Sequence, residues 1–280
     1  MLKSLTQEQV EHFRKYGYVA PIRVMSEQIT LELCKRLEDF EYSSSPLKKK
    51  ALNVKSHLLF SWLNELVHSD KVVNAVDNLY GKNLLVWASS FFIKNGNDPA
   101  YVSWHQDSTY WGLSKPDVVT AWVALSESNK SNGAMQVVPG MHLLDQIPHR
   151  DTFNENNLFT RGQKVAVDVD ESQAVSLELE PGEMSLHHVR IVHGSPPNTS
   201  PNRRIGYAIR YIPTYVRQLE GDDSATLVRG VDTYKTFEHE PRPTQDLDPA
   251  FVALHQQIGE RNLNILYKGA AQTAAASGRR

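Results

Sequence analysis

The stretch LLVWASSFFI, residues 84–93, decides the fold class. It is an apolar and aromatic run of strand type, bounded by Gly81 on one side and by the turn-forming cluster NGNDP, residues 95–99, on the other. Similar short segments follow it at regular spacing, which is typical of a barrel or a sandwich. These further predicted strands cover residues 118–125, 134–138, 164–169, 174–179, 184–188 and 205–212.

The sequence before this stretch predicts helices. Thr6 is a suitable N-cap for a first helix that carries Phe13 on its apolar stripe, and Gly17 can end that helix in a left-handed cap. Further helices are expected over residues 26–40, 57–69 and 71–80. The helix over residues 26–40 should bury Leu31, Leu33, Cys34, Leu37 and Phe40.

These patterns predict one domain over residues 1–280, mainly β with flanking α. Residues 1–82 form a mostly helical flank, and residues 83–213 form an antiparallel β-barrel core. Residues 214–267 are expected to be loop and helix. The Ala/Gly/Ser-rich residues 268–280 are expected to be a flexible tail.

The composition narrows the range of partners. A formal net charge of −2 leaves no basic excess to neutralise phosphates, so we expect no nucleic-acid partner. No run of 18 apolar residues and no signal-peptide pattern occurs, so we expect no membrane association. Cys34 is the single cysteine, which rules out an intrachain disulfide and favours a cytoplasmic protein. The sequence leaves the oligomeric state open.

The chemistry is concentrated in WHQD, residues 104–107, and in a distant histidine, His193. In an extended strand, His105 and Asp107 point to the same face. Two histidines and one carboxylate are the ligands that hold Fe(II) on one face and leave the other face open. The His-x-Asp pair alone is a weak signal, but His193 precedes a turn-forming stretch, GSPPNTS, and a further strand.

That further strand carries an arginine in an unusual setting. From Arg204 onward the residues alternate, with an aliphatic and aromatic face opposite a face of arginine and small residues. Small neighbours leave Arg204 room to point inward. A charge buried in a barrel is unfavourable unless an anion pairs with it, and a guanidinium can hold a carboxylate through two parallel hydrogen bonds. The pattern therefore predicts an anion site, which a dicarboxylate co-substrate would satisfy.

Together these motifs resemble the phytanoyl-CoA dioxygenase family of Fe(II)/2-oxoglutarate-dependent oxygenases. The resemblance covers residues 5–213 and lies in its combination and order of motifs: the opening helix ending in GYV, WHQD, AWVAL, NGAMQVVPGMH, and HGS-x-x-N-x-S with an arginine eleven residues past the histidine. It implies a double-stranded β-helix, the jelly-roll or cupin-like barrel, with N-terminal helices. It also implies Fe(II), 2-oxoglutarate and O2, with ascorbate supporting the iron.

The resemblance implies a role for each matching residue. His105, Asp107 and His193 would be the iron ligands. Related halogenases carry a small residue at the position of Asp107, so its carboxylate favours hydroxylation. The cofactor-binding residues would be Arg204 on the distal carboxylate of 2-oxoglutarate, Ser195 and Trp122 as helpers, Gln106 within the co-substrate-binding stretch, and Lys94.

Several of these assignments have alternatives. Gln106 can instead contact strand neighbours, and Lys94 can instead be a solvated lysine. His188 competes with His193 as the distal ligand, but a hydrogen-bonded barrel residue is the better interpretation. The substrate pocket is predicted from Tyr110, Trp111 and Arg210, with the aromatic pair equally explained as hydrophobic core.

The implied reaction is the hydroxylation of an unactivated C–H of a small molecule, with release of succinate and CO2. Desaturation and cyclisation on the same iron chemistry remain open. A zinc hydrolase or isomerase can use the same three ligands, and a ligand-binding barrel without catalysis is a third possibility. The zinc enzyme leaves Arg204 unexplained. The identity of the substrate stays open, although the lack of an evident basic patch disfavours an acyl-CoA ester.

Overall fold

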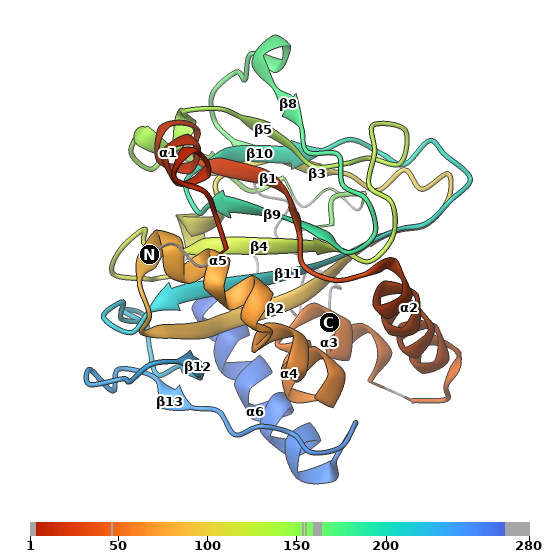
Figure 1. Ribbon diagram of the computed structural model, residues 1–280, viewed down its shortest axis with the longest axis vertical. Coiled ribbons are helices and arrows are strands. Elements are labelled where there is room, and N and C mark those ends of the chain that lie inside the picture. The colour runs from red at the N-terminus through yellow and green to blue at the C-terminus, as the bar shows by residue number, and fades with distance from the viewer. Residues whose placement is uncertain (1–3, 46, 153, 155, 159–163, 267–280) are drawn as a thin grey trace.

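The computed structural model describes residues 4–45, 47–152, 154, 156–158 and 164–266, and the predicted tail over residues 268–280 lies outside this part. Its strands form a seven-stranded sheet in the order β1-β9-β4-β11-β2-β12-β13 and a four-stranded sheet in the order β3-β10-β5-β8 (Figure 1). The sheets do not close into one barrel. The predicted jelly roll is therefore confirmed as two sheets with a cavity between them.

The strand bounds follow the sheets. The larger sheet contains β1 (Tyr18–Arg23), β2 (Leu84–Lys94), β4 (Val119–Ala124), β9 (Glu183–His188), β11 (Arg204–Pro213), β12 (Ser224–Arg229) and β13 (Glu238–His239). The smaller sheet contains β3 (Val102–His105), β5 (Gln136–Val138), β8 (Val175–Ser176) and β10 (Val192–Ser195). A separate pair is formed by β6 (His149–Arg150) and β7 (Lys164–Val165).

The central strand β11 sets the two sides of the larger sheet, as its alternation predicts. It lies between β2 and β4, antiparallel to both. One of its faces buries Ile205, Tyr207, Ile209 and Tyr211 in the main core, together with side chains of the helices. Figure 1 shows α4 and α5 lying across this sheet. The other face of β11 is left for the cavity.

α1, α2 and α5 match predicted helices, but the helix predicted between α2 and α5 differs from the structure. The N-cap of α1 is Thr6, in a capping box with Gln9, and Gly17 ends the helix in the left-handed region. The helix bounds are α1 (Gln7–Tyr16), α2 (Glu27–Tyr42), α3 (Lys48–Asn53), α4 (Ser61–Val67), α5 (Asp70–Tyr80) and α6 (Pro249–Leu266).

Two details of the predicted helices are wrong. The helix predicted over residues 57–69 is divided into a 3-10 turn, η1 (Ser56–Leu58), and α4, because Phe60 is extended between them. The carboxylate of Asp246 accepts the backbone N–H of Ser61 at 2.8 Å, so a distant residue fixes the start of α4. Leu31 is 64% exposed, and Thr30 takes its place on the buried side of α2.

Several strands were not predicted, among them β1 and β12. β1 contains Pro21 in the sequence YVAPIR, and it lies at the edge of the larger sheet against β9, where a residue without an N–H is tolerated. β12 lies within residues 214–267, where only loop and helix were expected, and it pairs with the far edge of β2. β12 can pair only because the edge of β2 opposite β11 is available, and the local sequence of residues 224–229 does not reveal this.

A buried polar cluster ties the segment after β13 to the helical flank. We call Lys55, His57, Ser224, Thr226 and Glu240 the Lys55 cluster; all five are buried. The Lys55 Nζ donates to the Glu240 carboxylate and to the Ser224 backbone oxygen. Hydroxyls of Ser224 and Thr226 donate to the same carboxylate at 2.7 and 2.6 Å. Burial raises the pKa of Glu240, but the Lys55 charge and the contacts of His57 outweigh burial and hold that pKa well below its usual range.

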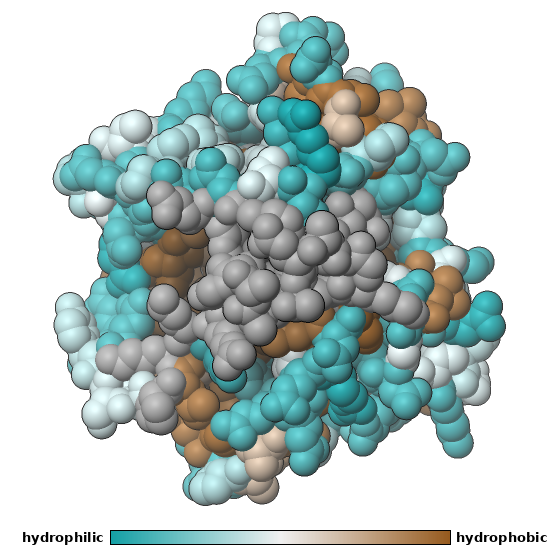
Figure 2. All heavy atoms as spheres, turned by 180° about the vertical axis from the view of Figure 1, so that it is seen from behind, coloured by the Kyte–Doolittle hydropathy of each residue, from teal (hydrophilic) through white to brown (hydrophobic). Residues whose placement is uncertain are grey.

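One face of the molecule is mostly hydrophilic. Outside the grey region, the face seen in Figure 2 carries mostly hydrophilic side chains, with apolar ones in separate groups. Among the described residues, no helix combines the length and the apolar character that crossing a bilayer requires.

Candidate active site

The two predicted histidine ligands come from neighbouring strands of the smaller sheet. β3 ends at His105 and pairs antiparallel with β10, and His105 and His193 are direct register partners. Asp107 begins a 3-10 turn, η2 (Asp107–Tyr110), after an extended Gln106. The strand is therefore shorter than the same-face argument assumed, and the turn brings the carboxylate to the histidines.

The three side chains form a compact, buried set. Their ligand atoms all lie within 4.8 Å of one another. The Nε2 of His105 is 3.2 Å from the Oδ1 of Asp107, and the two imidazole centroids are 4.0 Å apart. The predicted ligands are thus brought together with a spacing that suits one metal ion.

The hydrogen bonds of the rings show that this set needs a cation. The Nδ1 of His105 lies 2.9 Å from the Ser103 backbone oxygen, and the Nδ1 of His193 lies 3.0 Å from the Ile191 oxygen. A carbonyl only accepts, so each Nδ1 carries the proton and each neutral ring presents a lone pair at Nε2. The His105 lone pair then faces the Asp107 carboxylate, an arrangement that a metal ion or a second proton must bridge.

Burial favours the neutral rings that a metal requires. It lowers the pKa of His193 well below the usual value, and a protonated His105 beside it would lower that pKa further. Burial raises the pKa of Asp107, but the attraction of its carboxylate to Arg210, and to the two rings when they are protonated, outweighs burial and holds that pKa below its usual value. The donor set therefore fits a divalent metal such as Fe(II).

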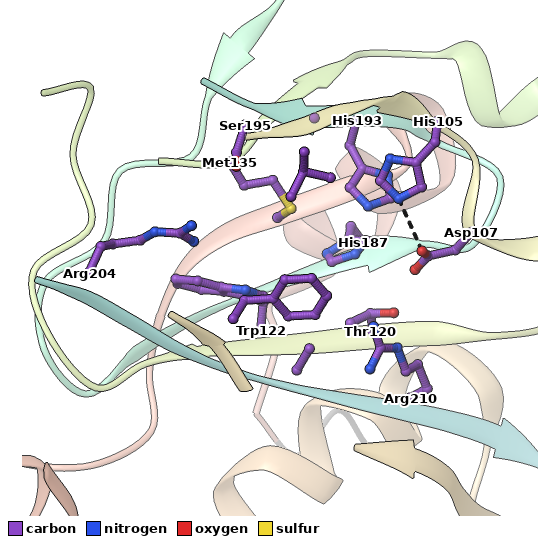
Figure 3. A pocket seen from close by; sticks show the side chains of 14 residues that line it. His105, Asp107, Thr120, Trp122, Met135, His187, His193, Ser195, Arg204 and Arg210 are labelled. Carbon is purple, nitrogen blue, oxygen red and sulfur yellow. Dashed lines mark hydrogen bonds and ion pairs between the residues drawn. The ribbon is translucent and has the colours of Figure 1, made fainter. Parts of the chain in front are cut away.

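The cavity beside the triad lies between the two sheets, and its enclosed part measures about 40 Å³. In Figure 3 the triad projects from the smaller sheet, and Trp122 and Thr120 lie on the opposite side. Arg204 and Arg210 lie at opposite ends of the same view. The lining residues are Phe92, Val102, His105, Asp107, Thr120, Trp122, Met135, His187, His193, Gly194, Ser195, Arg204, Ala208 and Arg210.

Arg204 is a buried cation without a carboxylate partner among the described residues. It is 2% exposed, and its Nε and Nη2 atoms have no hydrogen-bond partner there. Its Cζ lies 5.3 Å from the ring centroid of Trp122, over the indole face. Burial lowers the pKa of Arg204 to about 10, still well above neutral, so the group remains charged. These are the properties of an anion site at one end of the cavity.

Lys94 lies beside this anion site. The alternative prediction, that Lys94 is a solvated lysine, is therefore wrong. Arg204 and Lys94 are register partners on β11 and β2, and Lys94 is fully buried. Its Nζ donates to the Ser195 Oγ at 2.6 Å and to backbone oxygens of Ser195 and Pro196. Burial, and then the charge of Arg204, lower the pKa of Lys94 to about 6. Lys94 therefore fixes the Ser195 hydroxyl at the cavity wall.

Other predicted site residues lie elsewhere. Gln106 does not line the cavity: its amide donates to the Arg190 oxygen at 2.9 Å and accepts from the Ile147 N–H at 2.8 Å, which is the neighbour-contact alternative. Trp111 is half-buried against Trp87, with ring centroids 4.9 Å apart, just outside the cavity lining. The side chain of Tyr110 lies outside the described part of the structure.

The competing histidines have separate roles. The Nδ1 of His188 accepts the Arg190 N–H at 3.1 Å, and its ring lies 5.3 Å from that of His142, so it is a hydrogen-bonded residue outside the cavity lining. His187 does line the cavity, 4.9 Å from the His193 ring.

His187 and Thr120 are cavity residues that the sequence argument did not assign. They are cross-strand partners on β9 and β4. Burial lowers the pKa of His187 to about 4, so its ring is neutral at pH 7. The signal for both was alternation: Thr120 stands between Val119 and Ala121, and His187 follows Leu186, and all three of these apolar residues enter the main core.

A close contact between Gly206 and Trp122 positions the wall below Arg204. A Cβ built on Gly206 would overlap the indole of Trp122. Gly206→Ala is therefore expected to destabilise the fold by about 1–3 kcal/mol. It should also weaken 2-oxoglutarate binding, because Arg204 lies on the same indole. Denaturant unfolding and titration with 2-oxoglutarate measure both effects. Gly221→Ala is the matched control, since its Cβ would meet only ordinary contacts; equal behaviour of the two variants would contradict the prediction.

Two mainly antiparallel sheets with a buried His-Asp-His set between them define a jelly-roll protein with a metal site of the 2-His-1-carboxylate class. The phytanoyl-CoA dioxygenase (PhyH) family model matches residues 13–206, and the chain belongs to this family. This confirms the resemblance inferred from the motifs.

Comparisons with individual proteins agree with this membership. A probable alpha-ketoglutarate-dependent hypophosphite dioxygenase of Stutzerimonas stutzeri is 34% identical over 159 residues, 54% of each chain. The chain thus spans about half the length of the curated relatives that it matches. The apo structure of the non-heme monooxygenase ThoJ is 33% identical, with a TM-score of 0.83 over 93% of this chain and 98% of ThoJ. CytC3 with Fe(II) and alpha-ketoglutarate has a TM-score of 0.64 at 25% identity, over 88% of this chain and 96% of CytC3.

Proposed function

We propose that the protein is an Fe(II)- and 2-oxoglutarate-dependent dioxygenase that hydroxylates an unactivated C–H of a small molecule. The observation that carries this proposal is the pairing of the buried triad with an unpartnered arginine in one cavity. A zinc hydrolase has no use for a second, anionic ligand at Arg204. The family and the CytC3 complex support the same choice of metal and co-substrate.

One set of residues would bind the metal, and another would bind the co-substrate. His105, Asp107 and His193 would hold the iron, and the protonated Nδ1 atoms of the two histidines leave their Nε2 lone pairs free to bind it. Arg204 would bind the distal carboxylate of 2-oxoglutarate, with the Ser195 hydroxyl and the Trp122 indole beside it. Bound iron would supply the oxidative chemistry, by which 2-oxoglutarate and O2 give succinate, CO2 and the oxidised substrate.

The apolar part of the cavity wall would help to exclude water from the reaction. The cavity lies between the sheets, and Phe92, Val102 and Met135 are apolar members of its wall. A dry cavity strengthens the electrostatic attraction between Arg204 and a carboxylate and protects reactive species from solvent. Asp107 favours hydroxylation over halogenation, since its carboxylate occupies the ligand position that a halide would need.

The decisive experiment follows succinate production. Purified protein is supplied with Fe(II), 2-oxoglutarate, O2 and ascorbate and tested against a panel of small molecules. We expect succinate formation that requires both iron and 2-oxoglutarate and is stimulated by some members of the panel. Zinc-supported turnover without 2-oxoglutarate would contradict the proposal.

Arg204→Ala is expected to raise the half-saturating concentration of 2-oxoglutarate by roughly 10- to 100-fold, the value of one to two charge-assisted hydrogen bonds. The half-saturating concentration of the substrate should change far less. The control is Arg203→Gln, because Arg203 forms a two-pronged ion pair with Glu41 away from the cavity. Equal effects of Arg204→Ala on both concentrations would remove Arg204 from this role.

A further inference from the structure

The cavity face of β11 carries a second arginine, Arg210, that the binding of 2-oxoglutarate does not use. Arg204 and Arg210 point to the same side of the strand and both line the cavity. Six residues of strand separate them, which is about 20 Å between their Cα atoms. In Figure 3 Arg210 lies at the end near Asp107 and Thr120, opposite the end with Arg204. A co-substrate that reaches from the metal to Arg204 therefore extends away from Arg210.

The partners of Arg210 do not neutralise its charge. The side chain is buried, and its Nη1 donates to the Ser90 hydroxyl at 2.7 Å. Its Cζ lies 5.6 and 5.7 Å from the ring centroids of Phe92 and Trp111. These neighbours are neutral, and its Nε has no hydrogen-bond partner among the described residues. Asp107 is the acid that interacts electrostatically with Arg210, and its carboxylate would be bound to the metal ion.

Polar atoms beside Arg210 add to the same end of the cavity. The Thr120 Oγ1 and the His187 Nδ1 are buried and have no hydrogen-bond partner within the described chain. Both residues line the cavity together with Arg210, and they face each other across β4 and β9. A buried guanidinium and two unsatisfied polar groups leave room for a ligand that brings several acceptor oxygens.

The size of the cavity limits this ligand. The enclosed space measures only about 40 Å³. The same space must also hold 2-oxoglutarate, so the second ligand is small.

On the basis of the proposed function, we infer that the primary substrate is a small organic oxyanion, a carboxylate or a phosphonate, whose anionic group is bound by Arg210. The C–H to be oxidised then lies within a few bonds of that group, because Asp107 at the metal is in the same part of the cavity. This assigns the two arginines to different ligands, Arg204 to the co-substrate and Arg210 to the substrate.

The test compares anions with neutral molecules of the same shape. Protein with Fe(II) and saturating 2-oxoglutarate is titrated without O2, so that the Arg204 end is already occupied. The probes are propanoate with propanamide, butanoate with butanamide, and ethylphosphonate. The readouts are the visible iron-to-2-oxoglutarate charge-transfer absorption and the midpoint of thermal unfolding. We expect saturable changes with at least one anion at a concentration about tenfold or more below that of its amide. Comparison of carboxylates with the phosphonate identifies the preferred oxyanion.

The variant Arg210→Gln should abolish this preference, and Arg203→Gln, which removes an arginine next to the same strand, should retain it. If Arg210→Gln does not fold, the wild-type comparison of anions and amides still decides. Equal response to anions and amides, no response to any anion, or a preference that survives in Arg210→Gln overturns the inference. Failure of the charge-transfer absorption to form with Fe(II) and 2-oxoglutarate alone would instead refute the proposed function, and the inference with it.

Discussion

Replacement of His105 or Asp107 by alanine is expected to abolish both tight Fe(II) binding and the conversion of 2-oxoglutarate to succinate. Each change removes one of the three buried ligand groups, which lie within 4.8 Å of one another. Even the loss of an outer hydrogen-bond partner of a ligand lowers metal affinity or activity by about 10- to 100-fold. We therefore expect a decrease of roughly 100-fold or more, measured by metal titration and by succinate formation.

The design of this experiment separates loss of the metal from loss of the fold. Far-ultraviolet circular dichroism should be unchanged in the variants, because the apolar core lies on the other face of the larger sheet. His239→Ala is the matched control: this histidine is partly exposed and pairs with Asp232 away from the cavity. Near-native turnover in both His105→Ala and Asp107→Ala would exclude the triad as the metal site.

Replacement of Glu240 by glutamine is expected to destabilise the protein by about 3–5 kcal/mol, the usual effect of leaving a buried charge unpaired. Lys55 would lose its carboxylate, and the hydroxyls of Ser224 and Thr226 would lose a charged acceptor. Urea unfolding at neutral pH measures the change. The double variant Lys55→Met/Glu240→Leu should be less destabilised than the sum of its two single variants, because neither charge is then left alone. Additive effects would show that the Lys55 cluster is not a coupled unit.

The same cluster predicts how stability depends on pH. The pKa of Glu240 is lower in the folded protein than in the unfolded chain, so its contribution is fully present above the unfolded value, about 4.3. That contribution is lost as the pH falls below this value toward the folded pKa. The stability difference between wild type and Glu240→Gln should therefore be largest near neutral pH and should shrink in acid.

Local sequence was sufficient where one short segment determines its own structure. The capping of α1 by Thr6 and Gly17, and the two faces of β11, follow from residues next to one another in the chain. The metal triad was predictable because its motif and the later histidine keep a recognisable order. These features required no knowledge of which distant residues meet.

The features that the sequence did not predict depend on contacts between residues far apart in the chain. The start of α4 is set by Asp246, and the edge position of β1 is what makes Pro21 acceptable in a strand. The burial of Lys94 depends on its register opposite Arg204 and on the Ser195 hydroxyl across the cavity. Nothing near a lysine in the sequence distinguishes a solvated side chain from one that is enclosed by two sheets.

The pairing of His105 with His193 in register has a consequence for folding. A slip of one residue between β3 and β10 would turn His193 to the opposite face and separate it from its partner. A metal ion held by both histidines would bridge two neighbouring strands whose ligands are far apart in the chain, and it would bind only the correctly aligned pair. Metal binding would then stabilise the pairing of β3 with β10. Added metal should raise the free energy of unfolding, more so the tighter it binds, even when no turnover takes place.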